Sequence, residues 1–581
     1  MKRLHGVAAA PGIVHGPYIV LEQAEDARGG QVAPDARAGE AERLERACGA
    51  AAAALDALAD RVAADGHPDE GEIFLAQASI ARDPALLQMA RARIEAGPDD
   101  AIAAIQAAGA AFADQLRSLD DELLAARAED VIDVTRRIAR QLAGRDDDPP
   151  GTLERPSIVV AHDLPPSVTA TLPRDRLLGL ALEGSSATAH AAILARAYGI
   201  PAVVGVDRLL AQLDEGSENG HGEAVALDGG TGEVVLDPDP ATLARFQARS
   251  LEQRRRHEND VRDAALPART TDGTEVALLA NIGAPGEGEA ALALGAHGVG
   301  LFRTEFLFLE RTSAPSEDEQ VAAYEQAIRE FAPHPVTIRL LDVGGDKQIP
   351  YLPIEPEANP FLGVRALRIA EVKPDVFVTQ LRSLYRASVA GPVKVMAPMV
   401  ADGRDADLLI SLAQQARDEL HAAGRQTGAV SLGVMLEIPS AILVADSFFA
   451  RLAFASLGTN DLAQYALAAD RGNARLARYR DALHPAVLRL VQLAVEASRR
   501  AGIDLSVCGE MAGDPASALA LTGLGLRSLS MAASSLPAVR RAVRGASLAE
   551  LEAAASAALF DPSAEAARAR FDALLSAGVP A

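Results

Sequence analysis

The sequence predicts an α/β protein of several domains, with a C-terminal (β/α)₈ barrel and an N-terminal α/β domain that carries an inserted helical bundle. The chain has 581 residues, too many for one hydrophobic core, so three or four domains are expected. Beyond about residue 270, apolar strand candidates alternate with amphipathic helical segments, which indicates a parallel sheet. Eight such units in roughly 300 residues match the length of a (β/α)₈ barrel. The strand candidates begin near Val276, Val299, Val336, Val393, Leu432, Ala453, Leu505 and Leu529.

The N-terminal part of the chain predicts a helical bundle set into a small α/β unit. Residues 40–145 are rich in alanine and have helical periodicity with few strand signals, which is typical of antiparallel helices. From about residue 155 the pattern changes to short β-branched runs at 157–161 and 202–205, with a helix around His190 between them. The opening segment 6–21 is also rich in strand-forming residues. It could join the same unit, which would make the helical block an insertion.

Composition excludes several classes of partner. The chain has 80 acidic and 56 basic side chains, and the formal charge of -24 repels nucleic acid and anionic lipid. Cys48 and Cys508 are far apart in sequence, so a disulfide framework is not indicated and a reducing compartment is expected. The pair Pro11 and Gly12 interrupts the first apolar stretch, and no apolar run approaches the roughly 20 residues that cross a bilayer. We therefore expect a cytoplasmic protein without membrane insertion.

Arginine side chains follow the predicted barrel strands at the point where two of them end. Arg303 and Arg339 stand at neighbouring strand ends, and Lys347 and Arg471 stand on nearby loops. In such barrels the chemistry gathers at the C-terminal ends of the strands. Guanidinium groups bind phosphate and carboxylate bidentately, so this cluster predicts a site for a multiply anionic ligand. The alternative is a set of structural salt bridges at the same edge of the barrel.

Other strand ends carry two carboxylates and a thiol. Glu437 and Asp461 supply the hard oxygen ligands that suit Mg²⁺, which keeps several waters and bridges carboxylates to substrate phosphate. Structural carboxylates are the alternative. Cys508 follows an apolar strand and precedes Gly509, so its thiol could enter the barrel as a proton donor or acceptor. A buried Cys that only packs as a small hydrophobe is the other interpretation.

Several long motifs together resemble the phosphoenolpyruvate-binding barrel of enzyme I of the sugar phosphotransferase system. Their order and length make them jointly specific, and the resemblance spans nearly the whole chain. The matching segments are 300–308, 339–347, 359–365, 458–462, Gln464 with Tyr465, 470–473 and 508–510.

The resemblance implies a role for each residue at the strand ends. Arg303, Arg339 and Arg471 would hold the phosphate, and Asn460 with the Asp461 backbone would complete the substrate site. Lys347 and Arg365 would line that site. Glu437 and Asp461 would ligate Mg²⁺. Cys508 would protonate the enolate that remains after the phosphoryl group leaves, which gives pyruvate.

The acceptor is identified from residues 185–196 and 199–203, which are similar to the family's phosphohistidine segment with His190 as the nucleophile. A neutral imidazole is a competent nucleophile near neutral pH. Without the resemblance, a His at the start of an alanine-rich helix is more often a packed or capping residue. Thr169 matches a residue that orients the ring. The sequence departs from the family, which usually has two glycines and an arginine at 185–187 and a serine or cysteine at 189; here Ser185, Ser186, Ala187 and Ala189 stand there.

The family also implies a domain plan and a partner. A swivelling phosphohistidine domain would collect the phosphoryl group at the barrel and pass it to a small histidine-containing phosphocarrier protein, as the first step of the phosphotransferase system. Residues 71–77 resemble the carrier-binding helix, with Phe74 as an apolar anchor and Glu70 and Glu72 as partners for a basic face; an ordinary bundle helix is the alternative. A homodimer through the barrel is expected. The predicted domains are 1–22 with 146–234 (phosphohistidine), 23–145 (carrier binding), 235–268 (linker) and 269–581 (barrel).

Two other functions fit part of the sequence. An enzyme like pyruvate phosphate dikinase or phosphoenolpyruvate synthase shares the histidine and barrel modules, but it needs a nucleotide-binding domain. The sequence has neither a Gly-rich phosphate loop nor about 200 spare residues for one. A non-catalytic phosphoenolpyruvate sensor is suggested by the altered residues before His190, whereas the intact strand-end residues argue against it.

Overall fold

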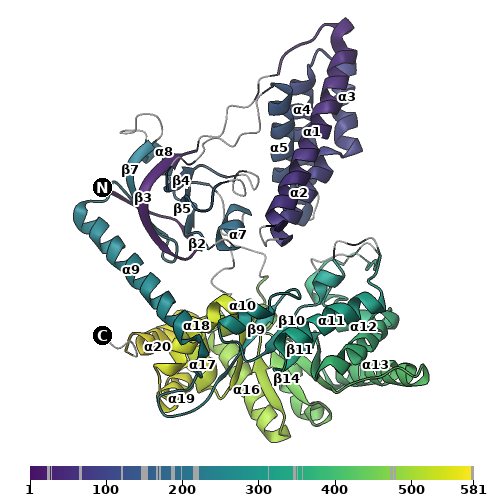
Figure 1. Ribbon diagram of the computed structural model, residues 1–581, viewed down its shortest axis with the longest axis vertical. Coiled ribbons are helices and arrows are strands. Elements are labelled where there is room, and N and C mark those ends of the chain that lie inside the picture. Colours follow the sequence, from purple (N-terminus) through teal and green to yellow (C-terminus); the bar gives the residue numbers. More distant parts are fainter. Residues whose placement is uncertain are drawn as a thin grey trace. The chain divides into compact units, whose positions relative to one another are not determined.

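The structure is a computed structural model of the chain. It describes the chain except for residues 22–26, 28, 65–67, 119–121, 145–152, 154, 165–167, 169–171, 185–189, 198, 214–220, 310, 312, 345–348, 350, 356, 471–475, 477–478, 480 and 578–581. The chain divides into two compact units, Met1–Arg255 and Arg256–Ala581 (Figure 1).

In the first unit, eight strands of the described residues form one mixed sheet in the order β1-β8-β7-β3-β4-β5-β6-β2. β3 pairs in parallel with β4, with Tyr18 opposite Ile158, although the helical block separates these strands in sequence. The opening segment therefore belongs to the same sheet, and the prediction that the helical block is an insertion is confirmed. The strands are β1 (Lys2–His5), β2 (Val7–Ala10), β3 (Ile13–Val20), β4 (Ser157–Ala161), β5 (Leu177–Leu182), β6 (Ala202–Val204), β7 (His221–Asp228) and β8 (Glu233–Leu236).

The inserted block is a bundle whose helices bury an apolar core rich in alanine. Leu44, Leu55, Phe74 and Ile138 lie in that core, and small alanines between them let the helix axes approach closely. Asp83 caps the third helix, because its carboxylate accepts hydrogen bonds from the N–H groups at the first turn. The helices are α1 (Arg37–Ala64), α2 (Pro68–Ala81), α3 (Pro84–Ala96), α4 (Ala101–Ser118) and α5 (Glu122–Leu142).

Three further helices belong to the sheet or follow it. On α7 (His190–Ala197), Ala191, Ala192 and Ala195 pack against the sheet with Val159 and Leu180. The short helix α8 (Leu209–Leu213) covers the other apolar cluster of the sheet. The predicted charged connector forms the long helix α9 (Pro240–Arg262), which begins in the first unit and ends in the second.

The second unit is a closed barrel of eight parallel strands among the described residues, as predicted. Each strand begins within two residues of the predicted position. The strands are β9 (Ala277–Ile282), β10 (Val299–Phe302), β11 (Val336–Arg339), β12 (Val393–Ala397), β13 (Val430–Leu436), β14 (Phe454–Leu457), β15 (Asp504–Val507) and β16 (Ser528–Ala532).

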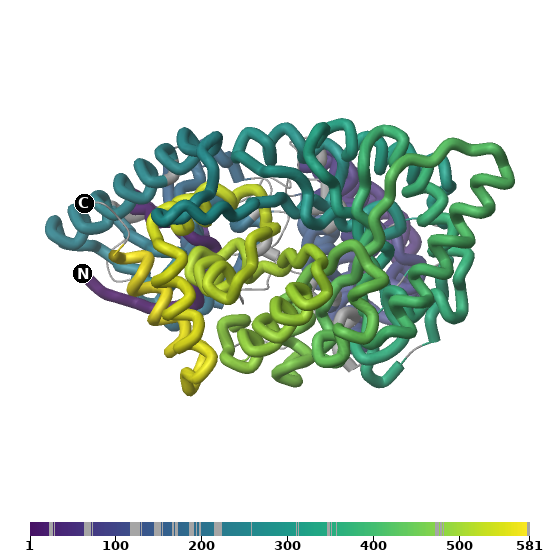
Figure 2. Tube along the Cα trace, turned by 90° about the horizontal axis from the view of Figure 1, so that it is seen from below, coloured from purple at the N-terminus to yellow at the C-terminus, as the bar shows by residue number. Residues whose placement is uncertain are grey.

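Helices cover the outside of the barrel and follow one another around it in chain order (Figure 2). Ser316 caps α11 with a reciprocal hydrogen-bond pair to Glu319, a local signal that the sequence carries. The helices are α10 (Gly288–Ala293), α11 (Glu317–Phe331), α12 (Pro374–Ala387), α13 (Gly403–Ala422), α14 (Pro439–Leu443), α15 (Thr459–Leu467), α16 (Pro485–Ala501), α17 (Pro515–Gly523), α18 (Leu536–Arg544), α19 (Leu548–Ala558) and α20 (Ala564–Ala577).

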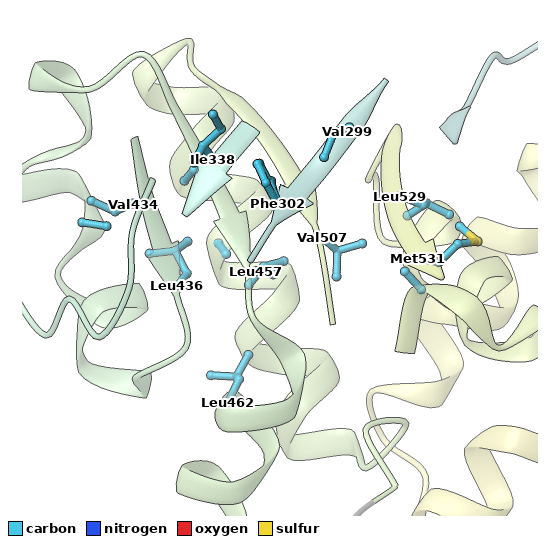
Figure 3. Packing of buried hydrophobic residues seen from close by; sticks show 14 of the residues in the cluster. Val299, Phe302, Ile338, Val434, Leu436, Leu457, Leu462, Val507, Leu529 and Met531 are labelled. Carbon is cyan, nitrogen blue, oxygen red and sulfur yellow. The ribbon is translucent and has the colours of Figure 1, made fainter. Parts of the chain in front are cut away.

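The strands divide their side chains between two apolar layers. Val434 and Leu436 belong to the outer layer between strands and helices (Figure 3), whereas Met435 belongs to a small cluster inside the barrel. Side chains alternate between the faces of a strand, so the next inward position after Met435 is residue 437. The same alternation turns Arg339 inward after Ile338. It turns Cys508 inward after Val507. The barrel thus directs polar strand ends toward its axis.

Among the described helices, none combines the length and the apolarity that crossing a membrane requires.

Candidate active site

The C-terminal ends of the barrel strands bring charged side chains together in a largely buried group, called here the barrel mouth: Arg303, Glu305, Arg339, Asp342, Arg365, Glu437, Asp461 and Cys508. Arg339 is the last residue of β11, and Glu437 is the first residue after β13. They are only 7% and 1% exposed. Charged side chains are seldom buried this far unless they are paired, so the arrangement of their partners decides what the site can do.

Five of these side chains form a row of alternating charge. Arg339 donates to Glu305 Oε1 at 2.6 Å, and its other terminal nitrogen lies 3.1 Å from Asp342 Oδ2. Asp342 also accepts from Arg365 Nη2 at 3.0 Å. Arg365 Nη1 lies 3.9 Å from Asp461 Oδ1 at the end of the row. Each guanidinium therefore has a fixed position between two carboxylates.

The ion pairs outweigh the cost of burying the two arginines. Burial alone would lower the pKa of Arg339 and Arg365, but the neighbouring carboxylates raise both above the ordinary arginine value. Both side chains therefore remain cationic. A cation held in this way can meet a ligand phosphate without first being ordered.

Glu437 lies where negative charge is in excess. Burial, followed by repulsion from Asp342 and Asp461, raises the pKa of Glu437 to about 8, although Arg339 opposes the shift. One carboxylate oxygen accepts the Met399 N–H at 2.6 Å. The φ angle of Met399 is 57°, in the left-handed region that side chains seldom adopt. This strained turn directs the N–H toward the carboxylate.

The donor set near Glu437 fits a magnesium ion. Oxygen ligands from two carboxylates, Glu437 and Asp461, suffice for Mg²⁺, because the ion keeps several waters and takes further oxygens from substrate phosphate. Within the described residues no group of three or more His, Cys, Asp or Glu side chains gathers into a metal site. A fully protein-built cage is therefore not found there. The repulsion that raises the Glu437 pKa is what a bound cation would relieve.

Cys508 is the only titratable side chain of the inner apolar cluster in the described barrel, where it packs with Leu301 and Met396. Burial raises its pKa to about 11; the nearby Ser456 hydroxyl and the charges of Arg339 and Arg303 oppose this, and Glu437 adds to it. The thiol donates to the Leu457 carbonyl, with 3.6 Å between sulfur and oxygen. The thiol is thus protonated at neutral pH and can act as a proton donor.

The charged groups that act on Cys508 also indicate which strand ends lie near one another in the barrel mouth. Arg303, Arg339 and Glu437, from three different strand ends, all act on this one thiol. The Asn281 amide fixes the Cys508 backbone, because it donates to the Cys508 carbonyl at 3.0 Å. The guanidinium groups of 303 and 339 therefore both lie close enough to Cys508 to act on its charge.

The remaining predicted residues differ in how closely the structure describes them. Arg303 is exposed at the first position after β10. Asn460 lies on α15 and accepts the Glu510 N–H at 3.0 Å, which fixes its amide beside the loop after β15. Arg365 donates to Asp342 rather than standing free. Lys347 and Arg471 lie outside the described residues.

His190 is the first residue of α7, so its backbone lies at a helix N-terminus. Thr169 and residues 185–189 lie outside the described residues, as do the side chains of Glu70 and Glu72. Phe74 is fully buried in the core of the bundle. The expectation that Phe74 is an exposed anchor for a carrier is therefore wrong, and the alternative of a bundle-core residue holds.

Sequence reasoning missed two residues that support Cys508. Ser456 stands on β14 and Asn281 on β9, each at an inward position of its strand near the mouth. Ser530 on β16 completes the support, since its hydroxyl donates to Asn281 Oδ1 at 2.6 Å. Side chains alternate between the inside and the outside of the barrel along each strand, and this alternation could have identified these positions. Polar residues are unusual on the inside of a packed barrel.

Comparison with known proteins identifies the family. Three family models match, described as PEP-utilising enzyme, N-terminal (residues 5–127), PEP-utilising enzyme, mobile domain (153–232), and PEP-utilising enzyme, PEP-binding domain (257–548). A Streptomyces coelicolor protein named phosphoenolpyruvate-protein phosphotransferase is 43% identical over 549 residues, which are 94% of this chain and 95% of that protein. The chain belongs to the phosphoenolpyruvate-protein phosphotransferase family.

Other members of the family share the same extent of similarity. The protein of that name from Geobacillus stearothermophilus is 38% identical over 563 residues, covering 95% of this chain and 94% of its own length. The Bacillus subtilis member is 35% identical over 553 residues, covering 95% and 96%. The resemblance drawn from the motifs is confirmed. The PEP-binding match contains all eight barrel strands, and the mobile-domain match contains α7 with His190.

Proposed function

We propose that this protein transfers the phosphoryl group of phosphoenolpyruvate to His190 and then to a histidine-containing phosphocarrier protein, with release of pyruvate. The observation that carries the proposal is the barrel mouth, where arginines from neighbouring strand ends and a protonated thiol face one site. Membership of the family supports the same reaction. Within the described residues nothing favours the dikinase-like enzyme. The altered residues before His190 are the one argument for a sensor, and the charged strand-end residues argue against it.

The arginines bind the anionic substrate in this proposal. Arg303, Arg339 and Arg471 hold the phosphate, Asn460 and the Asp461 backbone complete the site, and Lys347 and Arg365 line it. The ion pair between Arg339 and Glu305 leaves the guanidinium oriented before substrate arrives. Orientation in advance matters because phosphoryl transfer depends mainly on positioning and on charge stabilisation.

Glu437 and Asp461 would hold Mg²⁺ at the edge of the phosphate site. When bound, the ion supplies charge that screens the transferring group. The Met399 N–H holds the Glu437 carboxyl group in place. Asp461 is held between Arg365 and the start of α15.

Transfer then breaks the bond between phosphorus and the enol oxygen and forms a bond between phosphorus and an imidazole nitrogen of His190. The electron pair of the broken bond stays on oxygen and gives the enolate of pyruvate. The Cys508 thiol gives its proton to the methylene carbon, and solvent later returns a proton to the thiolate. A thiol with a pKa of about 11 is protonated at the start of each cycle.

The arrangement of the whole chain follows from the same proposal. Residues 1–22 with 146–234 form the swivelling phosphohistidine domain, 23–145 the carrier-binding subdomain, 235–268 the linker and 269–581 the barrel. We propose a cytoplasmic protein that forms a homodimer through the barrel. The acidic charge of -24 supports a basic carrier over nucleic acid as the partner.

The test is to incubate the purified full-length protein with radiolabelled phosphoenolpyruvate and Mg²⁺. We expect a label that is labile in acid and stable in base, as for phosphohistidine, and that His190→Ala abolishes. His334→Ala, at an exposed loop before β11, is the matched control and should keep the label. Label that persists in His190→Ala refutes the acceptor. A protein that binds the ligand and gains no label is a sensor.

A further inference from the structure

Gln380 is a fully buried polar side chain to which the proposed transfer assigns no part. It lies on α12, outside the barrel strands, and is 0% exposed. An amide in such a place is retained only if its donors and acceptor find partners. Gln380 has three hydrogen-bond partners: Thr304 in the segment after β10, Leu341 in the segment after β11, and Tyr324 on the neighbouring helix α11.

The hydrogen-bond partners of Gln380 fix the orientation of its side-chain amide. Its Oε1 accepts the Leu341 N–H at 3.0 Å, and because a backbone N–H can only donate, this bond fixes which way the amide points. Nε2 therefore donates to Thr304 Oγ1 at 3.1 Å and to the Tyr324 hydroxyl at 3.1 Å. The Thr304 hydroxyl in turn donates to the Arg339 carbonyl at 3.0 Å.

This network connects the two strand ends that carry the phosphate-binding arginines. Thr304 is the residue after Arg303, and Leu341 comes two residues after Arg339. One amide thus holds the backbone beside both arginines while touching neither guanidinium. Glu305 adds a second connection between the same segments, because it accepts both the Arg339 side chain and the Asp342 N–H.

We propose that Gln380 is a positioning residue that sets the spacing of Arg303 and Arg339. The proposal rests on the proposed function, in which these arginines hold the transferring phosphate. A displacement of about 1 Å in a group that aligns reactants costs roughly 100-fold in rate. Gln380 prevents such a displacement by fixing the ends of β10 and β11 to each other and to α12.

The experiment compares three variants of the full-length protein. Thr304→Val removes the hydroxyl link and keeps the shape, whereas Thr304→Ser keeps the link. Gln380→Glu still accepts the Leu341 N–H, but the Thr304 hydroxyl would turn to the new carboxyl group and leave the Arg339 carbonyl. Rapid-quench measurement of label transfer from phosphoenolpyruvate to His190 gives the maximal rate and the half-saturating concentration.

We expect the maximal rate of Thr304→Val and Gln380→Glu to fall about 10- to 100-fold, with the half-saturating concentration changed less than about threefold. Thr304→Ser should transfer at nearly the wild-type rate. The double variant Thr304→Val with Gln380→Glu should be no slower than the slower single variant, because both changes break one network.

The matched control is Gln320→Met on α11. Gln320 is also buried, at 2% exposed, and accepts the Tyr324 hydroxyl at 3.3 Å, so it lies one hydrogen bond further from the strand ends than Gln380. Its loss should lower thermal stability and leave the transfer rate unchanged. The proposal is overturned if Thr304→Val transfers at the wild-type rate, if Gln320→Met is as slow as Gln380→Glu, or if only the half-saturating concentration rises. Absence of label in the wild type would instead overturn the proposed function and this inference with it.

Discussion

Cys508 should react with alkylating reagents as a thiol whose pKa lies far above neutrality. Burial raises its pKa from the ordinary value of 9.0 to about 11. At pH 8 the thiolate fraction is then about one hundredth of that of an ordinary cysteine. The more basic thiolate is a better nucleophile, which recovers about a factor of ten. The net expectation is a rate about tenfold below that of an ordinary cysteine before any loss of access is counted.

The assay is alkylation of the native full-length protein by iodoacetamide between pH 7 and 10, followed by mass spectrometry of the peptide that contains Cys508. The logarithm of the rate should rise with unit slope and show no plateau below pH 10, because the slope depends on protonation and not on access. Ser456→Ala removes a neighbouring hydroxyl that lowers the Cys508 pKa, so it should move the curve to higher pH. A plateau at pH 8 to 9, or faster alkylation in Ser456→Ala, would contradict a protonated resting thiol.

Two predictions concern the bundle, with alkylation of the buried Cys48 as the probe of local opening. Phe74→Ala should destabilise the bundle by about 3–5 kcal/mol and speed Cys48 labelling, whereas an exposed anchor would affect only transfer to the carrier. Burial raises the pKa of Asp133 to about 6. The bundle therefore has its full free energy of unfolding below the ordinary pKa of 3.8, where Asp133 is protonated in both the folded and the unfolded chain. Part of that free energy is lost as the pH rises through 6, because the buried carboxyl group must then ionise. Asp133→Asn should therefore raise the free energy of opening by up to about 3 kcal/mol at pH 8, which slows Cys48 labelling. Near pH 4 the labelling rate should change little. Equal effects at both pH values would refute this prediction. The charged groups around Asp133 are Asp130, Arg136, Arg137 and Arg140.

The barrel was predictable because its signals are local. Each strand is a short apolar run bounded by turn residues and followed by an amphipathic helix, so the starts could be placed within two residues. The rule that chemistry gathers at the C-terminal ends of barrel strands then selected Arg339, Glu437 and Cys508 without knowledge of any contact. The strand alternation that directs these residues inward is also a property of the sequence.

Residues whose role depends on tertiary contacts could not be predicted in this way. Gln380 stands on a helix between Thr379 and Leu381, where a polar residue ordinarily faces solvent. Its burial arises only because α12 packs behind two strand ends whose backbone needs partners. The left-handed turn at Met399 is likewise invisible in sequence, since a non-glycine residue gives no signal for it. Phe74 was misassigned for the converse reason: motif similarity located the helix correctly but could not tell its inner face from its outer face.

Counting arginines in the sequence suggests a strongly cationic pocket, and the pairing of the charges changes that interpretation. The described part of the barrel mouth contains three guanidinium groups and four carboxyl groups. Because the pKa of Glu437 is raised to about 8, that carboxyl is mostly protonated at neutral pH and the net charge there is close to zero. Lys347 and Arg471 lie outside the described residues. Net charge in the described part therefore does not attract a phosphate ester. Under the proposed function, oriented donors would bind the phosphate ester together with a divalent cation that Glu437 and Asp461 would hold. The rigid spacing of Arg303 and Arg339 would then matter more than the number of arginines.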